Sequence, residues 1–177
     1  MCMETMVRPP KTILEVYQSL PEGTLCQIIN NQLIMSPAPA DIHQKALGKI
    51  FLVIADFIEK KQLGETRSGP SDVYLSKKNV FQPDIYFVTN ENVKKFKEDG
   101  FHGAPDLVIE VLSPSAAKYD LEDKKDIYEQ YGVKEYWCVE PQAKSVQGWS
   151  LVNGEFVSLS DDKAIIKSKL LKKEFPF

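Results

Sequence analysis

Two carboxylates occupy positions where the sequence is otherwise apolar. Asp84 begins the strand-like run 84–88, and Glu110 lies near the end of the run 105–112, between β-branched residues. A carboxylate among apolar side chains is costly to bury unless it is ion-paired, hydrogen-bonded or bound to a metal. We therefore expect both carboxylates to have partners, and we look for chemistry around them.

A predicted helix over 115–131 offers such a partner. At about 100° per residue, Asp120 and Lys124 fall on the same arc as the apolar residues of this helix. Lys125 falls on the opposite face with the remaining charged residues, so the helical periodicity favours Lys124 as the inward lysine. The helix would then bring an ammonium group back over the strand that carries Glu110.

Two carboxylates and one ammonium group at a sheet edge are typical of a divalent-cation site. Carboxylate oxygens are hard ligands for Mg²⁺, and a lysine can orient an attacking water or stabilise charge on a phosphate. The natural reaction is phosphodiester hydrolysis, with Asp84, Glu110 and Lys124 as the catalytic residues. The same spacing is compatible with a buried ion-pair cluster that has no chemistry, and the pattern alone leaves both interpretations open.

The elements that position these residues alternate in type and predict an α/β fold, a mixed central sheet flanked by helices. A long amphipathic helix is predicted over 41–61, where His43 lies on an apolar stripe. The run 105–112, the helix after it and a strand over 135–139 form a strand–helix–strand crossover. Other predicted elements are a helix over 11–20, strands over 25–29, 32–35, 65–67, 72–75, 84–88, 146–151 and 155–159, a loop with a helical turn over 89–103, and a weakly patterned segment over 165–177.

Composition favours one globular domain. The chain has 177 residues, of which 43% are hydrophobic, enough for one core but cramped for two. We expect a single domain over 1–177, with an N-terminal helical arm over 1–20 and a C-terminal tail over 161–177. The formal net charge of −3 gives no broad basic surface for nucleic acid or anionic lipid.

Cysteine usage and the N-terminal sequence favour a cytoplasmic protein. The three cysteines are widely spaced and form no CxxC pair, which argues against a disulfide framework and against a structural zinc site. The first residues lack the apolar core of a signal peptide, and the longest apolar run, 50–55, is too short to cross a membrane. We therefore expect no membrane partner.

Several linked motifs resemble the Uma2 family, a domain-of-unknown-function family within the PD-(D/E)XK nuclease superfamily. They begin with residues 25–39 and His43 and continue through QPDIYFV at 82–88. They are densest over 103–141, which contains PDLVIEVLSPS and YGVKEYW. The resemblance implies a restriction endonuclease-like core, in which a mixed central sheet is flanked by helices.

The resemblance also implies roles for individual residues. Asp84 and Glu110 match the metal-ligating acids of the superfamily, and the main-chain carbonyl of Val111 matches a further ligand. The superfamily usually places its lysine two residues after the acid, where this chain has Leu112. In families like Uma2 the lysine moves to the following helix, and Lys124 is the matching position. The implied cofactor is Mg²⁺ or Mn²⁺.

Three further residues are candidates for auxiliary roles. His43 matches a histidine of the family, although its place on the apolar stripe is equally typical of a hydrogen-bonded core histidine. Asp120 either fixes Lys124 through an ion pair or caps the core face of the helix. Gln27 stands where many relatives carry an acidic residue, so its presence is expected to weaken a second metal position.

Four other conspicuous residues are predicted to be structural. Asp106 shares the strand face of Glu110 but lies four residues away, roughly 13 Å along the strand. Tyr128, Tyr136 and Trp137 are predicted to pack in the core rather than to stack on nucleic-acid bases.

The leading hypothesis is a Mg²⁺-dependent endonuclease that cleaves DNA without a small-molecule cofactor, and we expect a homodimer by analogy with other nucleases. An alternative is a catalytically inactive module that binds nucleic acid or a protein partner, favoured by the acidic net charge and by Gln27. A hydrolase using Asp84 and Glu110 as an acid/base pair has no supporting motif. For the binding module, phosphate contacts would come from Lys77, Lys78, Lys94, Lys95 and Lys97, although a run of charges in a loop is equally typical of a solvated face.

Overall fold

A computed structural model describes residues 9–114 and 117–177, whose centre is a six-stranded sheet. Its strands run in the order β12 (Glu155–Lys163), β11 (Ser145–Val152), β10 (Glu135–Glu140), β9 (Leu107–Val111), β6 (Ile85–Thr89) and β3 (Gly64–Ser68). β9 and β10 pair in parallel, and the other neighbours pair antiparallel. The predicted mixed sheet and its strand–helix–strand crossover are therefore confirmed.

A second six-stranded sheet packs against one face of the central sheet. Its strands run in the order β2 (Gln32–Met35), β1 (Cys26–Ile29), β5 (Asn79–Phe81), β4 (Val73–Ser76), β8 (Gly100–His102) and β7 (Phe96–Lys97). β1 and β2 form the predicted hairpin. Its turn residues Asn30 and Asn31 have φ angles of 49° and 63°, which asparagine tolerates better than most residues.

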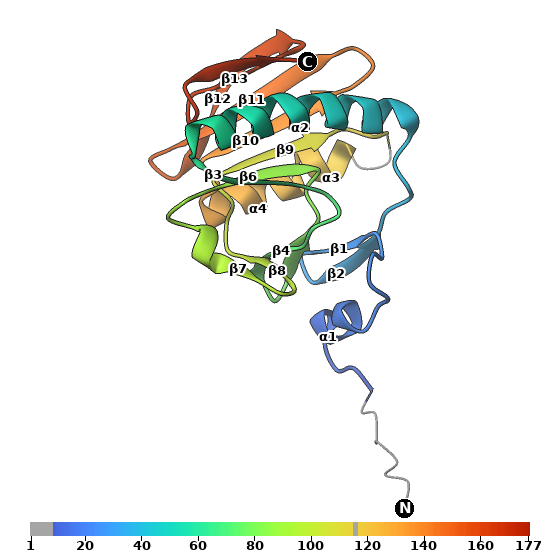
Figure 1. Cartoon of the computed structure of the whole chain (residues 1–177). Coiled ribbons are helices and arrows are strands. Elements are labelled where there is room, and N and C mark those ends of the chain that lie inside the picture. The colour runs from blue at the N-terminus through green and yellow to red at the C-terminus, as the bar shows by residue number, and fades with distance from the viewer. Residues whose placement is uncertain (1–8, 115–116) are drawn as a thin grey trace, which may run out of the picture.

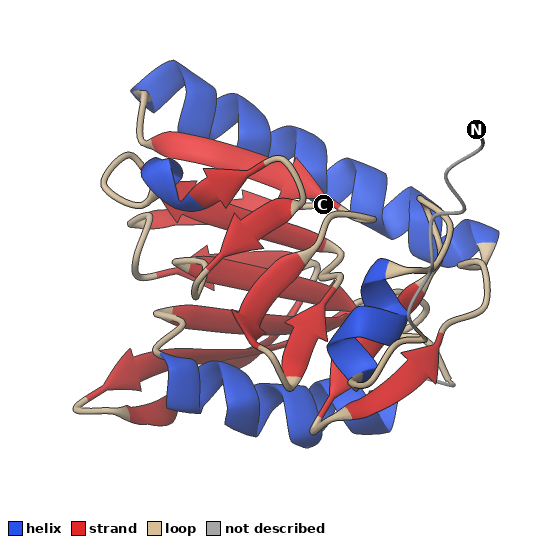
Figure 2. Cartoon of the chain, turned by 90° about the horizontal axis from the view of Figure 1, so that it is seen from below, coloured by secondary structure: helices blue, strands red, loops and turns tan. Residues whose placement is uncertain are grey.

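Helices complete the layers on either side of the central sheet (Figure 1). α2 (Asp41–Lys61) crosses one face and buries an isoleucine stripe against it. α3 (Ala117–Leu121) and α4 (Asp123–Tyr131) lie at the opposite face, as the view in Figure 2 shows. α1 (Ile13–Gln18) packs on the outer side of the second sheet. Because α2 and α3–α4 approach the same sheet from opposite sides, residues from both can meet where its strands end.

The crossover between β9 and β10 contains two helices rather than the single predicted one. The backbone leaves helical geometry at Glu122, whose φ is −115° and ψ is −84°. Asp120 and Lys124 nevertheless remain buried on the inward arc, each 3% exposed. Ser115, where the helix was predicted to begin, lies outside the described residues. Gly132 ends α4 as predicted, with a φ of 85°.

Short segments contain more structure than their sequence predicts. The predicted loop 89–103 holds the 3-10 helix η1 (Val93–Lys95) together with β7 and β8, and β5 was missed. Residues 165–177 contain a hairpin, β13 (Ile165–Ser168) and β14 (Lys173–Pro176), that buries Ile166 and Phe175 against the α2 side of the core. Strands of two to four residues depend on distant partners, so local periodicity is a weak signal for them.

Glu135 links this C-terminal hairpin to the central sheet through hydrogen bonds. Its carboxylate, buried at the start of β10, accepts hydrogen bonds from Ser168 Oγ at 2.6 Å and from the Leu170 N–H at 2.6 Å. Trp137 Nε1 donates to the same carboxylate at 3.3 Å. Within residues 9–114 and 117–177, no helix has the length and apolarity that crossing a membrane requires.

Candidate active site

Asp84 and Glu110 lie next to each other in the central sheet, where β6 begins and β9 ends. The antiparallel register pairs Ile85 with Ile109, so the residue before β6 falls opposite the residue after Ile109. The Asp84 N–H accordingly donates to Glu110 Oε2 at 3.2 Å. Two carboxylates that are 26 residues apart in sequence are thus brought together by strand pairing.

Lys124 reaches this pair from α4. Its ammonium Nζ lies 3.0 Å from Glu110 Oε1 and 2.8 Å from Asp120 Oδ1, and it sits 5.8 Å from the centroid of the Phe81 ring. The Lys124 and Glu110 side chains are only 4% and 3% exposed. The helical arc therefore places Lys124 over Glu110 as predicted, and Asp120 supplies its second ion pair.

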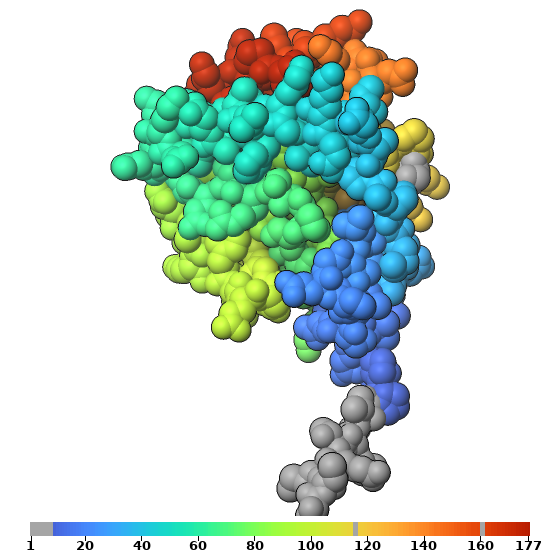
Figure 3. Space-filling view, turned by 45° about the vertical axis from the view of Figure 1, so that its right-hand side comes forward, coloured from blue at the N-terminus to red at the C-terminus, as the bar shows by residue number. Residues whose placement is uncertain are grey.

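The N-terminal end of α2 contributes His43. His43 Nε2 lies 3.1 Å from Asp84 Oδ2, and the same carboxylate oxygen accepts a hydrogen bond from the Val111 N–H at 2.7 Å. The Asp84 side chain keeps 21% of its surface exposed. Figure 3 shows the N-terminal end of α2 at the surface. Of the two carboxylates, Asp84 is thus the one that solvent can reach.

Burial and neighbouring charge displace the pKa values of Glu110, Lys124 and His43. Burial, helped by the nearby carboxylates Asp120 and Asp84, raises the pKa of Glu110 to about 8 despite the opposing effect of Lys124. Burial alone would lower the pKa of Lys124, but the Asp120 and Glu110 carboxylates outweigh it, so this pKa lies above its usual value. Burial also lowers the pKa of His43, and the Asp84 carboxylate reverses that effect.

The cluster is chemically suited to a cation. Asp84, Glu110 and Asp120 are three carboxyl groups, and the basic side chains that contact them are His43 and Lys124. The acidic groups outnumber the basic groups by one, so a negative charge is left over once Glu110, whose pKa is raised to about 8, releases its proton, as it must on binding a metal. Among the described residues, no group of three or more His, Cys, Asp and Glu side chains is arranged to hold a metal ion. A cation here would rely on two carboxylates with main-chain and water oxygens, a coordination that Mg²⁺ commonly accepts.

Comparison with known proteins places the chain in a family. The family model of Uma2, described as "Putative restriction endonuclease", matches residues 14–174. The chain belongs to the Uma2 family. A solved structure described as "a putative nuclease belonging to DUF820 from Anabaena variabilis ATCC 29413" is similar in fold. It has a TM-score of 0.75 and 16% sequence identity, and the match covers 92% of each chain. No curated protein matches the chain significantly.

Membership of Uma2 confirms the resemblance that the motifs indicated and the mixed α/β fold of a restriction endonuclease-like protein. Restriction endonuclease-like proteins generally use a divalent metal, which agrees in kind with the excess of acidic over basic groups in the cluster.

Two tyrosines of the Uma2 chain belong to this cluster in a way that the sequence did not indicate. Tyr128 was predicted to be a core residue, and it is buried, but its hydroxyl donates to Glu110 Oε1 at 3.3 Å. The hydroxyl of Tyr136 donates to the main-chain carbonyl of Asp120 at 2.8 Å. Tyr128 follows Lys124 by one helical turn on the same arc, so its position, though not its bond, was predictable.

Two other residues that the sequence singled out lie apart from the cation cluster. Asp106 is buried and engaged by Lys134 Nζ at 2.7 Å, with further hydrogen bonds from Thr89 and Asn92, which agrees with its predicted structural role. Gln27 Oε1 accepts a hydrogen bond from the Gln82 N–H at 3.1 Å.

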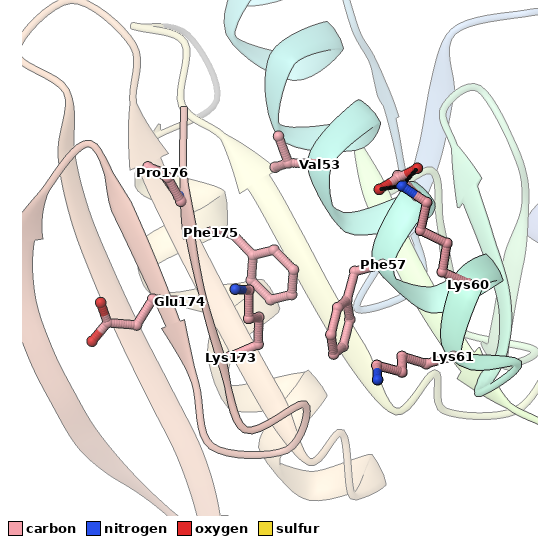
Figure 4. Close-up of a pocket in the computed structure, with 9 residues that line it drawn as sticks. Val53, Phe57, Lys60, Lys61, Lys173, Glu174, Phe175 and Pro176 are labelled. Carbon is pink, nitrogen blue, oxygen red and sulfur yellow. Dashed lines mark hydrogen bonds and ion pairs between the residues drawn. The ribbon is translucent and has the colours of Figure 1, made fainter.

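A surface pocket lies at the other end of α2, between this helix and β14 (Figure 4). It has a volume of about 320 Å³ and is lined by Phe57, Lys61, Lys173 and Phe175 together with neighbouring residues. At about 1.5 Å per residue along the helix, Phe57 lies roughly 20 Å from His43. The pocket shares no residue with the Asp84–Glu110–Lys124 cluster.

Proposed function

We propose that this Uma2 protein is a Mg²⁺- or Mn²⁺-dependent endonuclease that hydrolyses phosphodiester bonds of DNA. The observation that carries the proposal is the buried Glu110–Lys124 pair beside the part-exposed Asp84, in a cluster whose acidic groups outnumber its basic groups. A buried ion pair by itself contributes little net stability. A functional reason for retaining it is therefore reasonable, and family membership supports nuclease chemistry.

Each residue has a distinct task in this mechanism. Asp84, Glu110 and the Val111 carbonyl would hold the metal, which when bound lowers the pKa of a coordinated water and polarises the scissile phosphate. Lys124, kept protonated by Asp120, would stabilise the charge that develops on the phosphate in the transition state. His43 and the Val111 N–H fix the orientation of the Asp84 carboxylate.

The test is a titration of Mg²⁺ and Mn²⁺ into the purified protein, followed by calorimetry and by nicking of supercoiled plasmid. Glu110→Ala is expected to lose both metal binding and nicking. Glu91→Ala, which removes an exposed acid after β6, is the matched control and is expected to retain both. Cleavage by Glu110→Ala at the wild-type rate would overturn the mechanism.

A second candidate, a nucleic-acid- or protein-binding module without catalysis, is favoured by one observation. The acceptor Asp84 Oδ2 is occupied by His43 and the Val111 N–H, and Glu110 Oε1 is occupied by Lys124 and Tyr128. Salt-dependent DNA binding without metal binding would support this candidate.

We also infer a homodimer for the endonuclease, because an enzyme that cuts both strands of a duplex needs two active sites and twofold symmetry supplies them. Sedimentation velocity at assay concentration tests this, and a monomer that cuts both strands would contradict it.

A further inference from the structure

We propose that Gln27 is a positioning residue that fixes the segment carrying Asp84. The proposal rests on the proposed function in one respect, because it takes Asp84 to be a metal ligand. Gln27 lies on β1, and Asp84 directly precedes β6, so the link joins the two sheets. Its basis is the hydrogen bond between Gln27 Oε1 and the Gln82 N–H.

The segment 82–84 joins β5 to β6 and belongs to neither strand. Its main-chain donors are therefore satisfied by side chains. The Gln82 N–H donates to Gln27 Oε1 at 3.1 Å, and the Asp84 N–H donates to Glu110 Oε2 at 3.2 Å. Pro83 has no N–H to place. Gln27 and Glu110 together hold both N–H groups of the link, one at each end.

The side chain of Gln82 anchors the same segment as well. Its amide Nε2 donates to Asp72 Oδ1 at 2.9 Å, to the Thr24 carbonyl at 3.3 Å and to the Tyr17 hydroxyl at 3.4 Å. Gln27 thus holds the main chain of Gln82, and these contacts hold its side chain. Displacement of the Gln82 main chain would be transmitted through the rigid Pro83 to Asp84.

The chemistry of this bond also defines what Gln27 does not do. A main-chain N–H can only donate, so the oxygen of the Gln27 amide must face Gln82. The Gln27 amide oxygen, the group of this side chain that could bind a hard cation, thus already accepts a hydrogen bond from the main chain. In our proposal Gln27 acts on the site through Asp84, by holding the main chain that carries it.

The test compares Gln27→Met, which removes the acceptor at similar size, with Gln27→Glu, which retains an acceptor oxygen. Gln32→Met makes the same change at an exposed position of the neighbouring strand β2 and is the control. One readout needs no metal: the chain has two histidines, and the NMR resonances of the His43 ring report on its contact with Asp84. His102, paired with Asp99, is the internal reference.

The second readout is the calorimetric affinity for Mn²⁺. Gln27→Met is expected to shift the His43 resonances, to leave those of His102 in place and to weaken Mn²⁺ binding roughly tenfold, as residues that orient metal ligands do. Gln27→Glu is expected to restore both readouts, which a general loss of stability would not explain.

The two proposals fail in different ways. Unchanged His43 resonances and unchanged Mn²⁺ affinity in Gln27→Met would overturn the positioning role and leave the endonuclease proposal intact. If Gln27→Met shifts the His43 resonances but the wild-type protein binds no Mn²⁺, the positioning of Asp84 is supported and the metal mechanism is overturned.

Discussion

The Lys124 ammonium lies 3.0 Å from Glu110 Oε1 although neither side chain is more than 4% exposed. Lys124 Nζ also lies 2.8 Å from Asp120 Oδ1, so one buried cation contacts two carboxyl groups. Removing a single member of such a group leaves charge without compensation, whereas the intact group gains little over apolar packing. The cluster is therefore sensitive to single substitutions.

Lys124→Met should destabilise the fold by about 3–5 kcal/mol, because it leaves Glu110 and Asp120 buried without a cation. Urea unfolding followed by circular dichroism measures the change. Lys125→Met is the control, because Lys125 is more exposed and only rests over the Trp149 ring at 5.4 Å. A loss for Lys124→Met no larger than that for Lys125→Met would show that the buried pair is energetically unimportant.

Stability should fall as pH rises between about 5 and 8. The pKa of Glu110 is raised by burial to about 8, above the 4.5 of an unperturbed glutamate, so in this range the folded protein binds the proton that the unfolded chain has released. The free energy of unfolding then decreases with pH. His43 acts with the same sign, because its pKa is also raised: burial lowers it, but the Asp84 carboxylate outweighs that effect.

Glu110→Gln isolates this effect, because the amide mimics the protonated acid and cannot titrate. Its melting temperature should change less between pH 5.5 and 8.5 than that of the wild type. Parallel profiles for the two proteins would mean that Glu110 is ionised throughout the range.

The residues of the site were predictable where one periodic element determines each of them. The period of two put Glu110 on an inward face, and the period of 3.6 put Lys124 on the inward arc, so burial followed from local geometry. The hydrogen bond from Gln27 to Gln82 spans 55 residues and depends on how two sheets pack, which no local pattern encodes. Likewise, the hydroxyl contact of Tyr128 required the three-dimensional position of Glu110.

The fold shows the same division. The helix 41–61 was predictable to the residue because its apolar stripe is long and regular. The hairpin of β13 and β14 was not, because its position is fixed by Glu135, more than 30 residues earlier. Glu135 is itself a carboxylate at the start of an apolar strand, so the rule that identified Glu110 could have been applied to it, but it was not singled out from the sequence.

Glu135→Ala should destabilise the protein by about 2–3 kcal/mol, because the donors of Ser168 and Leu170 would lose a charged acceptor in a buried position. The loss should be accompanied by faster hydrogen exchange in residues 165–177. Glu155→Ala, which removes an exposed acid at the start of β12, is the control and should change the free energy of unfolding by less than about 0.5 kcal/mol. Unchanged exchange in the hairpin would contradict its attachment through Glu135.

Binding of Mn²⁺ at pH 7 should release close to one proton. The pKa of Glu110, raised by burial to about 8, leaves this carboxyl largely protonated at pH 7, and a metal ligand must be deprotonated. The measured binding enthalpy should therefore vary with the ionisation enthalpy of the buffer, and the affinity should increase up to about pH 8 and then level off.

Asp120→Asn is the informative comparison, because it removes a carboxylate that raises the pKa of Glu110. On binding Mn²⁺ at pH 7, this variant should release a smaller fraction of a proton than the wild type. Binding whose enthalpy is the same in non-coordinating buffers of low and of high ionisation enthalpy would show that Glu110 is already ionised or is not a ligand.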